Sequence, residues 1–413
     1  MQLDEYEKKV LAGDFGPGMA MAMRIVVEAA RLLGAESLIS ITSSHIDGCL
    51  YHGDSGVHFS EKLVSLGAKV SVPTSLNVGS LDLKHTDIVK ASTHFKTMAR
   101  RLMDAHIELG CQQNWSCAPY QTGFRPKLGE QVAWGESNAV VFANSVLGAR
   151  TNRYGDFLDI CAAITGRAPY SGLHITENRR ATLVIDIQGL SEAQRADEVL
   201  YPLLGAWMGA QVGDNVAAIL GVPKDISEDA LKALGAGAAS TGAVGLFHVV
   251  GVTPEAATLD IATQGQPVEK TLFVNAQMIH QIRCNLSSGM GGELGTVTVG
   301  CPHFSFEESQ SLLALAAGRK FKIPFYINTN RAVMAKLEES ELLQPLQALG
   351  VTTVLDTCVL TTPILEADSG VLMTNSAKAA HYGPGNTGNK TLFGSLKECV
   401  ESAIAGKFVM EEK

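Results

Sequence analysis

The amino-acid sequence predicts an α/β fold in several layers with mainly parallel sheets. Helical stretches alternate with short apolar strands that end in polar loops, the pattern of parallel sheets covered by helices. The 413 residues are 46% hydrophobic and 18% charged, and the 41 glycines suit the many tight turns of such folds. A chain of this length is expected to form two or three α/β subdomains, with an approximate break near 190–270.

Composition also limits the classes of function. The net charge is −9 and no stretch is strongly basic, so a nucleic-acid partner is not expected. The N-terminus lacks the basic start and apolar run of a signal peptide, and no apolar run reaches about 18 residues. We therefore expect a cytoplasmic protein without a membrane partner, whose eight cysteines do not form four structural disulfides.

The first part of the chain predicts repeated rounds of helix, strand and polar loop. In parallel sheets the loops beyond the carboxyl ends of strands carry ligand-binding groups, so His45–Gly48 and Pro73–Asn77 are expected to lie at such a position. The predicted elements are helices over residues 1–35 with a break at Gly16-Pro17-Gly18, a strand in "SLISIT" (37–42), the loop "SSHIDG" (43–48), a second helix, strand and loop in "EKLVSLGAKVSVPTSLN" (61–77), and a helix at 136–148 that ends near Gly148.

The second part of the chain continues the alternation. It contains neither a repeat of fixed period nor a low-complexity tract. The predicted elements are a strand in "TLVIDI" (182–187), a helical Ala/Gly-rich segment at 191–240, a strand and turn in "VGLFHVVGVTPEA" (244–256), and strand-to-loop junctions in "GTVTVGCPH", "FYINTN", "VTTVLDTC" and "GVLMTNSAK".

Three cysteines share one sequence context. Cys117, Cys301 and Cys358 each precede a proline by at most five residues, and the last two directly follow β-branched strands. Three thiolates from distant segments suit an iron–sulfur cluster in which one iron has no protein ligand and acts as a Lewis acid. The alternative is three buried apolar thiols, the usual state of free cysteine. A zinc-binding module is a third possibility, although no pair has CxxC spacing.

The remaining cysteines are assigned mainly to the core. Cys161 and Cys399 lie on helical faces, and Cys111 is expected to be a core thiol near the site. The sequence does not assign Cys49 and Cys284 either to the core or to a metal site.

Longer motifs resemble a known family. The segments "SCAPYQTGFRPKLGEQVAWGESNAVVFANSVLGARTNR", "ITGRAPYSGLHITENR", "VGCPHFS", "LDTCVLTTP" and "TNSAKAAHYGPGN" resemble the large subunit or domain of the aconitase X family. The resemblance covers nearly all of residues 1–413. It implies aconitase-like α/β/α domains around an iron–sulfur cluster of undetermined nuclearity, with Cys117, Cys301 and Cys358 as ligands.

The resemblance also implies an activity and a partner. Family members eliminate water either from cis-3-hydroxy-L-proline, giving a pyrroline-2-carboxylate, or from mevalonate 5-phosphate. They need a small swivelling domain, fused or separate, whose serine is thought to act as the base. The segment after "GPGN" is too short for that domain, so the chain is expected to be a large subunit that requires a small partner. A non-catalytic metal-binding subunit is the alternative from another class.

Such an elimination needs a proton donor for the leaving hydroxyl and a cation for the substrate carboxylate. His45 and Asp47 are candidates for the proton transfer, against the alternative of an Asx turn with a surface histidine. Arg150 and Arg153, just beyond a helix, are candidates for holding the carboxylate, against plain surface solvation.

Further candidates lie in one polar loop and one helix start. His174, Glu177 and Asn178 offer mixed donors and acceptors for substrate. Glu136, Ser137 and Asn138 begin a helix whose N–H groups attract anions, although capping alone explains Ser137.

The last candidates follow the final strand-to-loop junctions. Lys378 could take up substrate charge and Ser376 could bind substrate, whereas helix capping by Asn375 or Ser376 explains this turn equally well. His303 is expected to hydrogen-bond near the cluster sulfurs.

Composition favours one of the two substrates. Hydroxyproline is a zwitterion and mevalonate 5-phosphate carries a phosphate, and the choice is not decided by the candidate cations Arg150, Arg153, Arg179, Arg180 and Lys378. Frequent Cys, Met, Gln and Asn and a modest charge differ from the Lys/Glu-rich profile of hyperthermophilic archaea. Hydroxyproline is therefore the favoured substrate, and mevalonate 5-phosphate the alternative.

Overall fold

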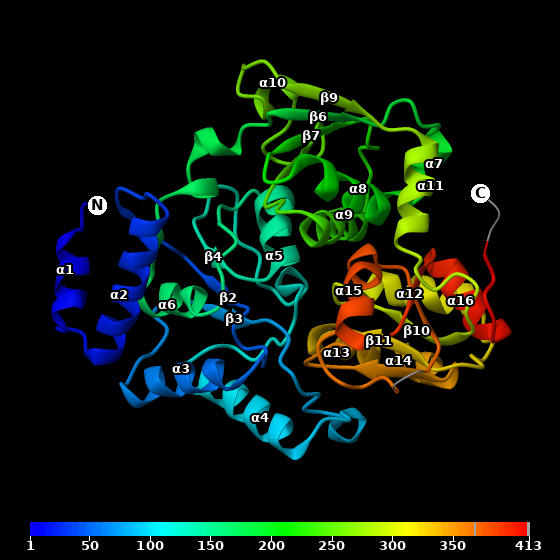
Figure 1. The fold of residues 1–413 in the computed structure, drawn as a ribbon, viewed down its shortest axis with the longest axis horizontal. Helices are drawn as coiled ribbons and strands as arrows, with labels where there is room; N and C mark the ends of the chain where they lie inside the picture. Colours follow the sequence, from blue (N-terminus) through cyan, green and yellow to red (C-terminus); the bar gives the residue numbers. More distant parts are fainter. Residues whose placement is uncertain (367–368, 411–413) are drawn as a thin grey trace.

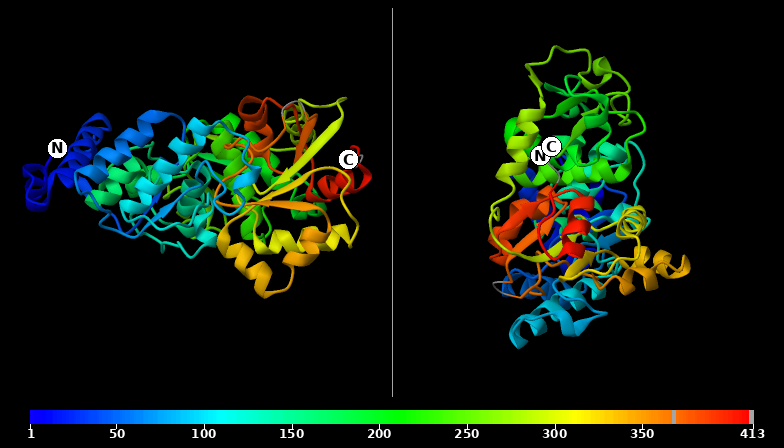
Figure 2. Two further views of the ribbon diagram at one scale, coloured as in Figure 1. Left: turned by 90° about the horizontal axis from the view of Figure 1, so that it is seen from below. Right: turned by 90° about the vertical axis from the view of Figure 1, so that its right-hand side faces the viewer.

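The computed structural model describes residues 1–366 and 369–410, which form three α/β units (Figure 1). We call residues 1–180 the first unit, 181–285 the second and 286–410 the third. The mixed α/β fold with mainly parallel sheets confirms the predicted fold class. The two termini lie at opposite ends of the molecule (Figure 2). No helix of the described ranges combines the length and hydropathy needed to cross a membrane.

The first unit contains a parallel sheet of order β3-β2-β4 and an antiparallel pair, β1-β5. Its strands are β1 (Leu38–Ser40), β2 (Ser44–Ile46), β3 (Thr74–Leu76), β4 (Ala133–Trp134) and β5 (Arg167–Pro169). Its helices are α1 (Glu5–Ala12), α2 (Pro17–Leu32), α3 (Asp54–Ser65), α4 (Thr93–Glu108), α5 (Ser137–Phe142), which continues as a π-helix over Ala143–Leu147, and α6 (Leu158–Thr165).

The two predicted polar loops of this unit were wrong. Segments 43–48 and 73–77 contain the central strand β2 and its neighbour β3, and His45 pairs in register with Ser75. Their polar side chains are buried because they bond to the sheet itself: Ser44 Oγ donates to the carbonyl of Ala133 at 2.6 Å. Apolar patterning cannot find strands whose buried residues are polar and mutually satisfied.

The second unit is a parallel sheet of order β8-β7-β6-β9 with α8 and α9 packed together beneath it (Figure 1). Residues 190–270 make up most of this unit, and the segment predicted to be helical at 191–240 is interrupted by β7. The short apolar run of β7 cannot be told from helix by composition. The elements are β6 (Leu183–Asp186), α7 (Glu192–Ala196), α8 (Leu200–Val212), β7 (Ala217–Leu220), α9 (Glu228–Thr241), β8 (Phe247–Val249), α10 (Leu259–Ala262), β9 (Lys270–Phe273) and α11 (Ala276–Asn285).

The third unit is a five-stranded parallel sheet of order β12-β11-β10-β13-β14. The strand order reverses between β10 and β13, which makes the carboxyl ends of these two strands the ligand-binding edge of a doubly wound sheet. All four predicted strand-to-loop junctions are confirmed. The elements are β10 (Leu294–Val299), α12 (Phe306–Ala316), β11 (Phe325–Asn328), α13 (Arg331–Glu339), α14 (Leu343–Ala348), β12 (Val351–Val354), β13 (Val371–Thr374), α15 (Ala377–Thr387), β14 (Thr391–Phe393) and α16 (Leu396–Ala405).

Continuous apolar cores join the three units. The loop after β12 inserts Val359 and Leu360 into the core of the first unit, beside Trp115. A smaller core joins α8 to α15 through Leu203 and Ala380. Because buried apolar surface crosses both boundaries, the loops that meet at the centre are held by packing as well as by their own hydrogen bonds.

Candidate active site

Three cysteine loops converge where the first and third units meet. Cys301 follows β10, Cys358 follows β12, and Cys117 precedes a short 3-10 turn at Pro119–Gln121. The Cys117 sulfur accepts the backbone N–H of His303 at 3.2 Å. The thiols are close enough for their charges to interact, since Cys301 raises the pKa of Cys117 and Cys358 raises that of Cys301. The structure thus brings together three thiols that lie far apart in the sequence.

These thiols are free and largely sheltered from water. Burial is the main cause that raises the pKa of Cys117, and it raises the pKa of Cys301 to about 12. Within residues 1–366 and 369–410, no group of three or more His, Cys, Asp and Glu side chains is arranged to hold a metal ion.

Lys378, on the first turn of α15, forms an ion pair beside the thiols. Its Nζ lies 2.6 Å from Glu136 Oε1 and 3.2 Å from Ser137 Oγ. Burial alone would lower the pKa of Lys378, but Glu136, Cys301 and Cys117 outweigh it and raise the pKa. In the same way, the Lys378 ammonium overcomes the burial of Glu136 and lowers the pKa of that carboxyl. Both groups are therefore charged near neutral pH.

Helix capping accounts for Ser376 but not for Ser137, so the capping alternative for Ser137 was wrong. Ser376 is the N-cap of α15: its Oγ accepts the N–H of Ala379 and donates to the carbonyl of Cys301. The N-cap of α5 is Glu136, whose carboxylate accepts the N–H of Ala139, and Ser137 follows it as the first helical residue. Both helix starts still lie beside the thiols, because Lys378 connects them.

His45 is a strand residue, which makes the predicted loop position and the surface-histidine alternative both wrong. The side chain is fully buried, Nδ1 lies 2.8 Å from Ser75 Oγ, and the ring lies against Trp134. Burial lowers the pKa of His45 to about 4, so the ring is neutral near pH 7. Its Nε2 is buried without a hydrogen-bond partner.

Asp47 follows β2 and is held by its backbone. Asp159 Oδ2 accepts the N–H groups of Asp47 and Gly48 at 2.7 and 3.2 Å, and Asn77 Nδ2 donates to Asp47 Oδ1. Burial, followed by the charges of Glu136 and Asp156, raises the pKa of Asp47 to about 7. The carboxyl of Asp47 can therefore give or take a proton near neutral pH.

Glycine at 135 is required by this arrangement. A Cβ at that position would lie 2.9 Å from the Cβ of Asp47 and 3.0 Å from Asp159 Oδ2. Any larger residue would push apart the two carboxyl groups that set the position of the Asp47 turn.

Two amide oxygens beside the site are also unpaired. Asn138 donates to the carbonyl of Cys117 at 3.2 Å and Asn77 donates to Asp47, whereas the Oδ1 atoms of both are buried without a partner. Together with His45 Nε2, they leave buried polar atoms available to a bound molecule, since native proteins rarely leave such atoms unsatisfied.

Four of the predicted substrate-binding residues lie in a different network. Arg150 donates to Thr176 Oγ1 and to the carbonyl of His174. His174 lies between Tyr154 and Gln131, and burial lowers its pKa to about 4. Glu177 and Asn178 are exposed, and Asn178 donates to the carbonyl of Gly172. These hydrogen bonds join residues of the first unit, and none of them reaches the cysteine loops.

Arg153 differs from these four. Its backbone bridges Trp134, the neighbour of His45 in the sheet, and its exposed side chain donates to the carbonyl of Ala239 at 3.2 Å. The residue therefore lies between the first sheet and the end of α9.

Sequence reasoning missed Asp159 and Lys232, and it marked Asn77 only as the end of an expected ligand-binding loop. Lys232 is buried on α9 and bonds Asp229, Glu308 and the His303 carbonyl. A signal existed for Asp159, because a single carboxylate inside the apolar helix "LDICAAIT" is costly to bury unless it is paired.

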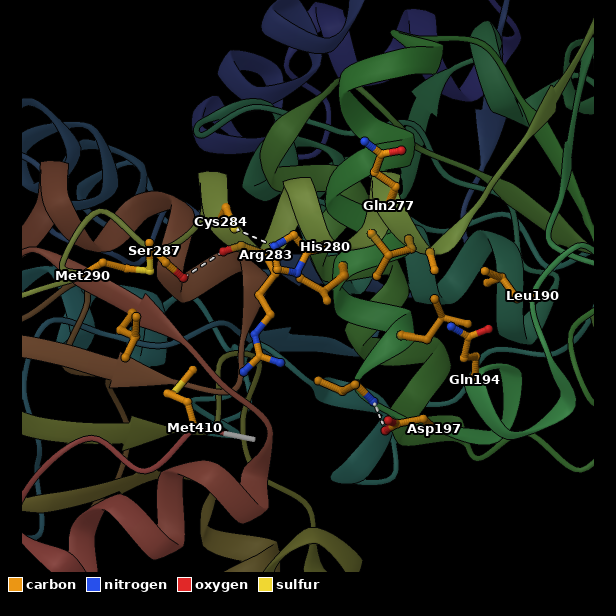
Figure 3. A pocket seen from close by; sticks show the side chains of 16 residues that line it. Leu190, Gln194, Asp197, Gln277, His280, Arg283, Cys284, Ser287, Met290 and Met410 are labelled. Atoms are coloured by element: carbon orange, nitrogen blue, oxygen red, sulfur yellow. Dashed lines mark hydrogen bonds between the residues drawn. The ribbon is translucent and has the colours of Figure 1, made fainter. Parts of the chain in front are cut away.

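An apolar hollow lies elsewhere in the molecule (Figure 3). It has a volume of about 670 Å³ and borders the segments that follow β6 and β9, with His280 and Cys284 on one wall. Cys284 Sγ lies 3.5 Å from His280 Nε2. None of the predicted site residues lines this hollow.

The loops of the parallel α/β units bring three thiols, an ion pair and a carboxyl to one point. This combination defines an aconitase-like protein. Residues 1–177 match the aconitase X first domain, residues 181–283 the second and residues 294–405 the third. The chain belongs to the aconitase X family, which confirms the resemblance seen in the sequence.

Individual relatives include both types of family member. The chain is 41% identical to a cis-3-hydroxy-L-proline dehydratase of Pseudomonas aeruginosa, over 98% of this chain and 70% of that protein. It is 35% identical to a phosphomevalonate dehydratase large subunit of Methanothermobacter thermautotrophicus, over 94% of each. The crystal structure of Thermococcus kodakaraensis aconitase X (holo-form) matches with a TM-score of 0.87 and 30% identity, over 98% of this chain and all of that chain.

Proposed function

We propose that this chain is the large subunit of a hydro-lyase that dehydrates cis-3-hydroxy-L-proline to a pyrroline-2-carboxylate. The observation that carries the substrate assignment is the charge balance around Lys378. One ammonium faces Glu136, lies near Asp47 and is held beside the thiols. A compact zwitterion matches this set, since its carboxylate can meet Lys378 and its ring ammonium can meet an acidic oxygen.

The relatives support the same substrate. Dehydratases of cis-3-hydroxy-L-proline are 41% and 40% identical to the chain, whereas the phosphomevalonate dehydratase large subunits are 30–35% identical. Arg150 and Arg179, which could have served a phosphate, are instead directed to Glu255.

The names of the relatives support a two-part enzyme. The chain matches 70% and 69% of the hydroxyproline dehydratases and 94% of a Methanothermobacter protein that is named a large subunit. Because that name implies a small subunit, we propose a small partner for this chain and expect it to contribute the serine base.

The cofactor in this proposal is an iron–sulfur cluster. Three thiols on separate loops fit a group in which each sulfur binds a different iron, better than they fit one ion. The unpaired buried atoms of His45, Asn77 and Asn138 lie beside the same loops and suit a bound substrate or water. When bound, a cluster with one open iron supplies a Lewis acid for the departing hydroxyl.

In this proposal, side chains of the large subunit bind the substrate carboxylate and supply the proton for the leaving hydroxyl. Lys378 holds the substrate carboxylate and thereby stabilises the charge that develops when the neighbouring carbon loses its proton. Asp47, whose pKa is about 7, is still partly protonated near neutral pH and supplies a proton to the leaving hydroxyl. Asp159 and Asn77 hold Asp47 in place for this transfer.

The second candidate is the phosphomevalonate reaction. The near-complete length match to large subunits of that enzyme favours it. A non-catalytic metal-binding subunit is a weaker third candidate, because a charged buried pair beside free thiols is costly to maintain without a function.

The test is anaerobic co-expression with a candidate small subunit. The complex is supplied with iron and sulfide and assayed on cis-3-hydroxy-L-proline and on mevalonate 5-phosphate. We expect turnover of the imino acid. Turnover of the phosphate alone would support the second candidate, and turnover of neither by an iron-loaded complex would support the third.

A further inference from the structure

His303 lies in the Cys301 loop and makes hydrogen bonds to both of the other cysteine loops. The residue is fully buried and lies two positions after Cys301. Its backbone N–H donates to Cys117 Sγ at 3.2 Å, its Nδ1 lies 3.2 Å from Ser116 Oγ, and its Nε2 lies 3.3 Å from the carbonyl of Thr357. His303 thus binds Cys117 directly, binds the residue before Cys358, and lies two residues after Cys301.

The partners assign the tautomer of the ring. The Thr357 carbonyl can only accept, so Nε2 carries the proton. Nδ1 then accepts the proton of Ser116 Oγ, which in turn accepts the N–H of Ala118 at 3.1 Å. A ring in this one tautomer satisfies both loops at once.

The His303 carbonyl extends the connection to the second unit. Lys232 Nζ on α9 lies 3.4 Å from this oxygen, and its other two close contacts are Asp229 at 2.7 Å and Glu308 at 2.6 Å. These three acceptors match the three protons of an ammonium. Gln121, on the turn after Cys117, also donates to the His303 carbonyl at 3.3 Å.

We propose that His303 is a positioning residue that sets the separation of the three thiol-bearing loops and so joins the three units at the site before any cofactor binds. This inference depends on the proposed function only for the identity of the cofactor. The hydrogen bonds themselves are made by the chain alone. The prediction is that removing one ring hydrogen bond frees one loop and leaves the other in place.

Three variants test this. His303→Leu removes both ring bonds, His303→Asn retains an acceptor near Ser116, and His303→Gln retains a donor near Thr357. His248→Leu is the matched control, since His248, in the second unit, is also buried and its Nε2 donates to the Arg179 carbonyl at 2.8 Å.

The first measurement is amide hydrogen exchange of the full cluster-free chain. We expect His303→Leu to speed exchange about tenfold in both loops, 114–122 and 356–362, because buried partners lose their hydrogen bonds. His303→Asn should free 356–362 alone and His303→Gln should free 114–122 alone. Unchanged exchange in all three variants, or equal changes in both loops for Asn and Gln, overturns the proposal.

The second measurement is the loss of iron to a chelator after reconstitution with iron and sulfide. His303→Leu should lose iron about tenfold faster than the wild type, while His248→Leu should match the wild type. Wild-type chain that takes up neither iron nor sulfide would contradict the proposed cofactor, and the exchange pattern would still decide the role of His303.

Discussion

Ser376 Oγ donates to the carbonyl of Cys301 and thereby ties the carboxyl end of β13 to that of β10. These are the two strands between which the order of the third sheet reverses. The residue that caps α15 is thus also the residue that holds a cysteine loop, so one side chain serves the helix and the site.

Ser376→Ala should reduce both stability and cofactor retention. Loss of an N-cap costs about 1 kcal/mol, and the Cys301 carbonyl also loses its donor. Ser395→Ala is the control, because Ser395 also caps a helix, α16, with its side chain, and no hydrogen bond links it to Cys117, Cys301 or Cys358 within the described residues. We expect similar losses in the free energy of unfolding by urea, but faster iron loss only in Ser376→Ala. Equal iron loss in the two variants would contradict this role.

Lys378→Met should destabilise the fold more than the double variant Lys378→Met/Glu136→Gln. The single change leaves the buried Glu136 carboxylate without its cation, which costs about 3–5 kcal/mol, whereas the double change removes both charges. Activity should be lost in both variants because the substrate carboxylate loses its partner. A double variant that regains turnover would exclude Lys378 from substrate binding; urea unfolding and the dehydratase assay supply the two readouts.

Cys117→Ser and Cys111→Ser should have opposite profiles. Cys117 belongs to the site, so its replacement should abolish iron binding and activity. Cys111 is a buried core thiol whose replacement buries a new hydroxyl and costs about 1–3 kcal/mol. Iron content per chain and the midpoint of urea unfolding separate the two effects, and equal losses of iron would refute the assignment.

Asp47→Asn should change how stability depends on pH. An unfolded aspartate has a pKa near 4, whereas the pKa of Asp47 is about 7 in the folded chain. The folded state therefore binds the extra proton between about pH 4 and pH 7, and this group's contribution to stability is lost as the pH rises through that window. We expect the variant to gain stability relative to the wild type at pH 8 but not at pH 4, as measured by urea unfolding.

The same substitution tests the proton donor. Activity of the wild-type complex should fall as the pH rises above about 7, and the remaining activity of Asp47→Asn should lack that limb. Asp159→Asn is the comparison, because it keeps an acceptor for the Asp47 backbone and leaves the carboxyl of Asp47 unchanged. An unaltered pH profile in Asp47→Asn would remove this residue from the proton transfer.

Arg150→Ala tests whether Arg150 holds the substrate carboxylate, as the sequence predicts, or only makes the hydrogen bonds that the structure shows. The guanidinium binds Thr176 and the His174 carbonyl, with Glu255 at 3.9 Å. We expect a stability loss of about 1 kcal/mol and a KM within about threefold of the wild type. A much higher KM with unchanged stability would restore Arg150 as the residue that holds the carboxylate.

The fold was largely predictable because its strands are mostly apolar. Segments such as 182–187 and the four junctions after residue 270 carry short runs of apolar or β-branched residues that end in polar loops. Strands β2 and β3 escaped prediction because their buried side chains are polar and bond to neighbouring strands. Strand β7 was not predicted because four apolar residues between two helices show no periodicity that distinguishes a strand from a helix.

The site was predictable in part. Cysteines, Lys378 and Asp47 stood out as reactive groups at strand ends, and motif resemblance assigned the cysteines. The link between Lys378 and Glu136 could not be predicted, because it depends on how α15 packs against α5. The hydrogen bonds of Arg150 and His174 to their neighbours could not be predicted, because buried structural polar clusters and binding clusters contain the same residue types.

The meeting of three separate loops at His303 also has a consequence for biogenesis. Cys117 and Cys301 belong to different units, so their approach is a long-range contact that forms late in folding. Until then the thiols of a nascent chain are solvated and open to oxidation or to wrong pairing. Refolding of the denatured chain should therefore require a reductant throughout, and the yield of loadable protein should report whether all three units have assembled.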